Sequence, residues 1–201
     1  MGKHAGHALC LTNCEMRNVK QPLFTAVTFS FGLLAMTTAH AECQIQLSEA
    51  QITYAPVTRG ELLSYPGNTL TSSELRIGDP RHLNIMISCE RPTAIALAFN
   101  GAAKDSENYR FGTDGRATLM LNDVFIDNQP VTIESVGQRG VEMAFTPGNT
   151  LRFWQNNRPA MGVTLRGKIT VTAWQPSKAT RINESKTWEL NGAFVTSGAS
   201  D

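Results

Sequence analysis

The chain has 201 residues, and its 18 Lys and Arg nearly balance its 17 Asp and Glu, so the formal net charge at pH 7 is +1. A chain so close to neutral carries neither the basic surface of a nucleic-acid-binding protein nor a polybasic patch for an anionic membrane. Composition therefore excludes nucleic acid and the membrane surface as expected partners.

The first 41 residues have the pattern of a secretory signal peptide. Basic Arg17 and Lys20 precede the apolar run PLFTAVTFSFGLLAM at 22–36, and the sequence AHA at 39–41 is a small-x-small cleavage site. The run is shorter than the roughly 20 residues that a membrane-spanning helix needs, and no later segment approaches that length. We expect the protein to be exported by this signal and to lack a membrane span.

The signal peptide sets the boundaries of the predicted domain. Residues 1–15 add nothing that a signal needs, so Met16 is an alternative start and 1–15 an extension of the gene model. A lipoprotein anchor on Cys43 is disfavoured, because Glu42 directly precedes that cysteine where a small residue is required. Residues 42–201, about 160 in number, are expected to form one domain.

Two cysteines remain after cleavage, Cys43 and Cys89. An even cysteine count in an exported protein is typical of a disulfide rather than a metal site. The sequence predicts one Cys43–Cys89 disulfide, which closes a loop of about 47 residues and contributes on the order of 4 kcal/mol in the chain-entropy model.

Alternation of apolar and polar residues predicts β-strands along most of the domain. The first predicted strand follows Cys43 with Ile45 and Leu47 on one face. The others are expected, in chain order, within 82–89, 93–101, 116–126, 130–136, 141–145, 161–174 and 187–196. Clusters of Gly, Pro, Asn and Asp separate them, and no long segment has an apolar stripe of helical period. The predicted fold class is all-β, most simply a sandwich of about seven strands.

Residues able to carry catalysis are few. His82 is the single histidine after the signal peptide, and it falls on the polar face of a predicted strand. Without a free thiol or a cluster of His, Asp and Glu at ligand spacing, neither a nucleophilic triad nor a zinc site is predicted. The carboxylate pairs Asp123/Asp127 and Asp105/Glu107 are interpreted as turn and surface residues. We therefore expect no enzyme activity, no metal and no cofactor.

Several features together resemble bacterial fimbrial subunits of the chaperone–usher type. They are the signal peptide, the run CQIQLSEAQITY from Cys43, a second cysteine that ends the strand LNIMISC, and closing strands that run to Phe194. The pattern is similar to a poorly characterised family of fimbrial-type proteins whose mature chains begin near the first cysteine. The resemblance implies an incomplete immunoglobulin-like β-sandwich that lacks its last strand and is completed by a strand from another protein.

The resemblance also implies a binding site and partners. An acceptor groove would lie between the first and final strands, lined by Ile45, Leu47, Trp188, Leu190, Gly192 and Phe194. The absent side chain of Gly192 is expected to leave room for a donor residue. The implied partners are a periplasmic pilus chaperone, an outer-membrane usher and a neighbouring fimbrial subunit. After transit through the periplasm the protein would lie at the cell surface, within reach of a host receptor or glycan.

The predicted cleavage site adds an expectation about assembly. Only Glu42 precedes Cys43, whereas a donor strand needs at least about 5–6 residues. We expect a minor or tip subunit that accepts a strand but does not donate one.

A second hypothesis is a free-standing exported module whose sandwich is complete and which binds a carbohydrate or a protein. Exposed aromatic rings would then stack on a sugar. The candidates are Tyr65, Tyr109, Trp154 and Trp174, each of which is also interpretable as a core residue.

Overall fold

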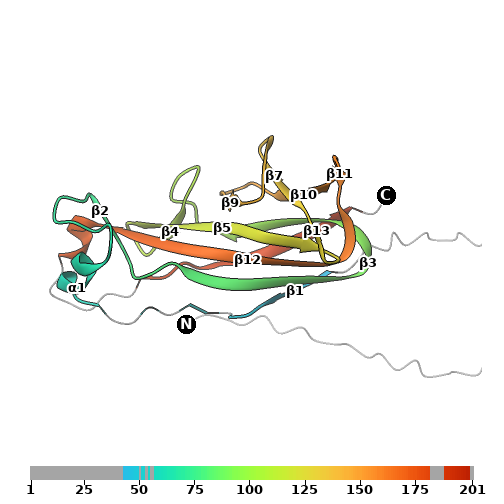
Figure 1. The fold of residues 1–201 in the computed structure, drawn as a ribbon. Coiled ribbons are helices and arrows are strands. Elements are labelled where there is room, and N and C mark those ends of the chain that lie inside the picture. The colour runs from blue at the N-terminus through green and yellow to red at the C-terminus, as the bar shows by residue number, and fades with distance from the viewer. Residues whose placement is uncertain (1–42, 50, 53, 55–56, 182–187, 200–201) are drawn as a thin grey trace, which may run out of the picture. The chain divides into compact units, whose positions relative to one another are not determined.

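A computed structural model describes residues 43–49, 51–52, 54, 57–181 and 188–199. The predicted signal peptide lies outside these residues. In the part of the chain that is described, an antiparallel sheet takes up most residues, with one short α-helix and one short 3-10 helix (Figure 1). The all-β prediction is confirmed.

The elements are numbered in chain order. The strands are β1 (Cys43–Leu47), β2 (Glu74–Arg76), β3 (Arg81–Gly101), β4 (Tyr109–Phe111), β5 (Gly115–Ile126), β6 (Gln129–Pro130), β7 (Thr132–Ser135), β8 (Gln138–Gly140), β9 (Met143–Phe145), β10 (Leu151–Gln155), β11 (Arg158–Pro159), β12 (Met161–Pro176) and β13 (Gly192–Ala199). The helices are α1 (Arg59–Ser64) and the 3-10 helix η1 (Ser177–Thr180).

The long strand β3 organises the sheet. Its first half pairs with β12 along one edge and with β1 along the other. Its second half pairs with β10 along the first edge and with β13 along the other. β5 extends the sheet beyond β12 (Figure 1). β7 and β8 extend it beyond β10. β1 and β13 therefore follow the same edge of β3, one along each half.

β3 runs continuously where the sequence predicted two strands. The segment that joins its halves, at 89–92, contains Pro92 and is largely exposed. The pairing of β3 with β12 passes from Ser88 to Thr93 across this segment. Proline cannot donate a ladder hydrogen bond, so it is tolerated where the pairing is interrupted.

The two halves of the sheet share one hydrophobic core. Alternate residues of β3 point inward, including Ile85 and Ile87 in its first half and Ile95 and Leu97 in its second. They join a single cluster with buried residues of β5, β7, β9, β10 and β12. A sheet whose halves bury their inward faces against each other is the arrangement of a β-sandwich.

A second, smaller cluster lies where α1, β2 and the end of β12 meet. Thr58 caps α1, because its side chain accepts from the Glu61 N–H while the Glu61 carboxylate accepts from the Thr58 N–H at 2.6 Å. Leu62 of α1 is buried against Leu75 and Phe111. The sequence did not predict this six-residue helix, which is too short to show a helical apolar stripe.

Gly60 and Gly115 allow a matched test of how closely the chain packs around each of them. A Cβ on Gly115 would lie 2.5 Å from the backbone oxygen of Trp174, whereas the nearest atom to a Cβ on Gly60 in α1 would be 3.8 Å away. We expect Gly115→Ala to lower the free energy of unfolding by about 1–3 kcal/mol through overpacking. Gly60→Ala should raise it by up to about 1 kcal/mol through helix propensity. Denaturant unfolding of both variants would check this, and equal effects would contradict the packing around Gly115.

Candidate functional site: the uncharged edge of the final strand

β13 pairs with β3 over its whole length. The register runs from Gly192 opposite Gly101 to Ala199 opposite Ala94, without a bulge. Within the described residues, β3 is the only strand that pairs with β13. The opposite backbone edge of β13 is therefore not part of a described ladder.

The side chains of β13 alternate between the core and the outer face. Phe194 and Thr196 are half-buried, whereas Ala193, Val195 and Ser197 are exposed. The Phe194 ring lies 4.9 Å from the Phe99 ring and 5.4 Å from the Phe145 ring, measured between centroids. These separations are within the favourable range for aromatic pairs, so Phe194 attaches the edge strand to the core.

β1 forms the neighbouring edge. Cys43 lies directly opposite Cys89 and is bonded to it, which confirms the predicted disulfide. Ile45 and Leu47 alternate with exposed glutamines and contact the same core as Phe194, but all three remain only half-buried. Partial burial at an edge leaves apolar surface that another chain could cover.

β1 and β13 lie close to each other. Cys43 of β1 lies opposite Cys89 and Ala199 of β13 lies opposite Ala94, so the two strands follow each other along the edge of β3, and some of their Cα atoms are within 8 Å. The disulfide fixes the end of β1 that lies nearer β13.

The predicted groove residues fall into two groups. Ile45, Leu47, Leu190 and Phe194 all contact the main core cluster. Trp188 instead belongs to the second cluster, with its ring against Gly112. Leu190 packs against both clusters, so it links Trp188 to the core that Ile45, Leu47 and Phe194 contact.

The predicted strand at 187–196 is corrected by the structure. Within the described residues the strand begins at Gly192, so Trp188 and Leu190 precede it. The physical reason is a hydrogen bond that does not belong to the β13 ladder. The backbone N–H of Gly112 donates to the backbone oxygen of Glu189 at 2.9 Å. This bond ties the segment before β13 to the turn between β4 and β5.

Gly192 has a different environment from the one expected. A Cβ at this position would lie 2.3 Å from Cζ of Phe99 and 2.7 Å from the backbone oxygen of Asn100. The space left by the missing side chain is thus filled from within the chain, by the Phe99 ring.

Phe99 and Phe145 were not assigned to the site from the sequence. Their alternation predicted inward-facing strand residues, but not that they would meet Phe194.

The aromatic rings proposed for sugar stacking are buried or covered. Tyr109 is fully buried, and its hydroxyl donates to the Phe99 backbone oxygen at 3.1 Å. The guanidinium of Arg116 lies 4.0 Å from the centre of the Trp174 ring, and that of Arg139 lies 3.7 Å from the Trp154 ring. Tyr65 packs against the second core cluster.

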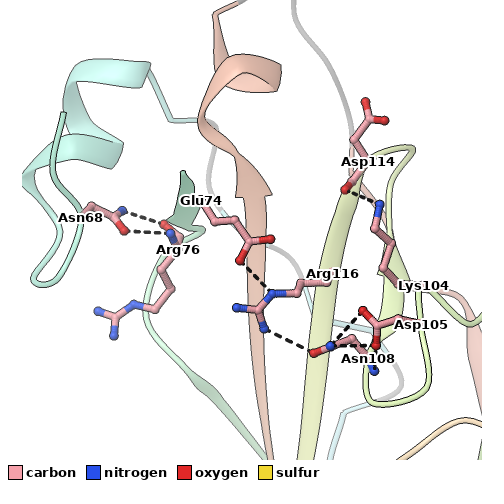
Figure 2. A network of polar contacts seen from close by, with 8 residues as sticks. All are labelled: Asn68, Glu74, Arg76, Lys104, Asp105, Asn108, Asp114 and Arg116. Carbon is pink, nitrogen blue, oxygen red and sulfur yellow. Dashed lines mark hydrogen bonds and ion pairs between the residues drawn. The ribbon is translucent and has the colours of Figure 1, made fainter. Parts of the chain in front are cut away.

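Polar contacts fix Arg116 over Trp174. Its Nε donates to the Glu74 carboxylate at 2.8 Å, and its Nη1 donates to the Asn108 side-chain oxygen at 3.3 Å (Figure 2). Glu74 comes from β2 and Asn108 from the loop before β4, so Arg116 connects both to β5. A stacked guanidinium held in this way occupies the ring face that a sugar would need.

The carboxylate pairs are occupied by structural bonds. Asp105 accepts from the Glu107 N–H and from Asn108, and these hydrogen bonds hold the pKa of Asp105 below its usual range. Asp127 accepts from the Thr164 N–H at 2.9 Å, and Asp123 pairs with Lys168. Among the described residues no group of three or more potential metal ligands is found, and no helix is long and apolar enough to cross a membrane.

Comparison with known proteins yields one structural likeness. No protein-family model matches the chain, and no curated protein matches it. The chain is similar to the crystal structure of the P pilus rod subunit PapA, with 12% sequence identity and a TM-score of 0.40, over 83% of this chain and 97% of that chain. A likeness at this level does not decide the function, which depends on the geometry of the edge itself.

Proposed function

We propose that the protein is an exported fimbrial-type subunit, and that its immunoglobulin-like sandwich is completed by a strand from another protein added along β13. The observation that carries this proposal is the composition of that edge. β13 is eight residues long, regular in its pairing, and contains neither a charged residue nor proline.

Edge strands normally carry features that prevent pairing with other chains, such as charge, proline or short length. β4 and β8 follow this rule, since each has three residues and each contains an exposed arginine, Arg110 or Arg139. β13 has none of these features. A long uncharged edge in an exported protein would aggregate unless a partner covered it, and an added strand covers it with backbone hydrogen bonds.

The partners that supply such a strand are, on this proposal, a periplasmic chaperone during export and a neighbouring subunit after assembly at an outer-membrane usher. With cleavage after Ala41, only Glu42 precedes β1, so the protein accepts a strand and has none to donate. That polarity corresponds to a tip or minor position at the cell surface, where a host receptor or glycan is accessible.

Hydrogen exchange of the exported protein tests the proposal at single-strand resolution. The probe is a synthetic peptide of about a dozen residues that alternates valine or isoleucine with threonine, and its control has the same composition with the alternation scrambled. In the free protein, every second amide of β13 should exchange rapidly, because it faces away from β3. Only the alternating peptide should protect these amides. Full protection of β13 without peptide would show a complete sandwich and favour the free-standing module.

A further inference from the structure

Two Asn-Gly dipeptides lie opposite each other at one end of the β3–β13 ladder. Asn100–Gly101 ends β3, and Asn191–Gly192 enters β13. Gly192 pairs with Gly101, and the next residue, Ala193, pairs with Asn100. Both dipeptides can undergo the same reaction, but the fold restrains their backbones to different degrees.

Asparagine before glycine can modify itself. The backbone nitrogen of the glycine attacks the side-chain amide carbon, a C–N bond forms, and the amide nitrogen leaves as ammonia. The resulting five-membered succinimide is opened by water at either carbonyl, which gives aspartate or isoaspartate. Glycine favours the attack because no Cβ crowds its nitrogen and its backbone rotates freely.

We propose that Asn191 is a self-modification site, and that the fold directs this chemistry to Asn191 rather than to Asn100. Asn191 is exposed and lies just outside the strand. Its side-chain Nδ2 lies 3.4 Å from the Glu189 carboxylate, which is a long contact. The attacking nitrogen belongs to Gly192, the first residue of the ladder, so only this terminal pair has to open before the backbone of Asn191 can reach the geometry that attack requires.

Asn100 is held on both sides. It lies within β3 opposite Ala193, and the residue after its glycine, Ala102, accepts from the Arg110 N–H at 2.7 Å. Attack by the Gly101 nitrogen moves the backbone on both sides of Asn100, so the Asn100–Ala193 pair and the Ala102–Arg110 bond have to open in addition to the terminal Gly101–Gly192 pair. Opening that costs about 1.4 kcal/mol or more slows the reaction at least about tenfold.

Conversion of Asn191 to aspartate or isoaspartate changes the contacts at the start of β13. An aspartate at 191 places a second carboxylate beside Glu189, so an attractive contact becomes a repulsive one. Isoaspartate also adds a methylene to the backbone immediately before Gly192. Gly192 is the first residue of the ladder, so the added length has to be taken up by the first pairs of β13. We expect those pairs to loosen, whether or not β13 accepts a donor strand.

The test is incubation of the folded exported protein at mildly alkaline pH, followed by peptide mapping with mass spectrometry and enzymatic isoaspartate detection. Asn191 should convert at least about tenfold faster than Asn100, and in urea the two rates should converge. Incubation in ¹⁸O-water should label only the converted residue. Equal rates in the folded protein, or conversion at Asn100 first, would overturn the proposal.

Asn191→Gln is the matched variant, because glutamine keeps the amide but its attack would require a less favourable six-membered ring. The variant should accumulate no product at position 191. On ageing, the wild-type protein should show faster hydrogen exchange at 192–194, and the variant should not. Loosening of β13 in both proteins would show that the change does not arise from Asn191.

Discussion

Phe194→Asp is expected to abolish stabilisation by an added strand and to lower the free energy of unfolding by about 3 kcal/mol or more. The substitution removes the contacts of Phe194 with Phe99 and Phe145 and places a carboxylate against the core. The measurement is thermal unfolding of each variant with and without the alternating peptide.

The neighbouring residue supplies the control. Val195 lies on the same strand but on the outer face, where 39% of its surface is exposed. Val195→Thr, which keeps a β-branched and uncharged side chain, should change the unfolding free energy by less than about 1 kcal/mol and should leave peptide stabilisation intact. Because Phe194→Asp could itself prevent folding, Phe194→Leu provides a milder variant, which should fold and respond less to peptide than the wild type. Equal peptide responses for wild type, Phe194→Leu and Val195→Thr would refute the assignment of the inward face of β13 to the site.

The second large effect is expected from loss of the disulfide. Replacing both Cys43 and Cys89 by serine should reduce the unfolding free energy by about 4 kcal/mol, because the bond closes a loop with a sequence separation of 46. It should also loosen β1, since Cys43 and Cys89 form the first pair of the β1–β3 ladder.

Denaturant midpoints and hydrogen exchange of β1 would measure the two consequences separately. The double variant avoids leaving one reactive thiol. An unchanged midpoint would mean that the β1–β3 pairing alone holds the first strand.

Much of the fold could be predicted from the sequence, because alternation is a local property. Strands β5 and β12 lie close to their predicted ranges, since each has a long run with one apolar face. β10 (Leu151–Gln155) was missed, because the adjacent Phe153 and Trp154 interrupt the alternation within its five residues. The continuity of β3 through Pro92 was also missed, because proline normally ends a strand and only the pairing with β12 shows that it does not do so here.

The site could be predicted only in part. Cys43, Ile45, Leu47 and Phe194 were identified from alternation and from the family resemblance, and the structure brings them to one core. Ladder register could not be deduced, so the aromatic partners of Phe194 were not expected. Trp188 has the spacing of an inward-facing residue of β13, but it is not part of that ladder. Its position is set by contacts with the turn between β4 and β5.

Thermal unfolding of the protein with increasing alternating peptide tests most directly whether β13 is an open edge that accepts a strand. At a peptide concentration of 100 times Kd, binding to the folded state alone adds about 2.7 kcal/mol, or about 5–10 °C in Tm for a domain of this size. We predict a saturating rise of that magnitude with the alternating peptide and none with the scrambled peptide. A protein that is already stable and whose Tm is unchanged by either peptide would contradict the account.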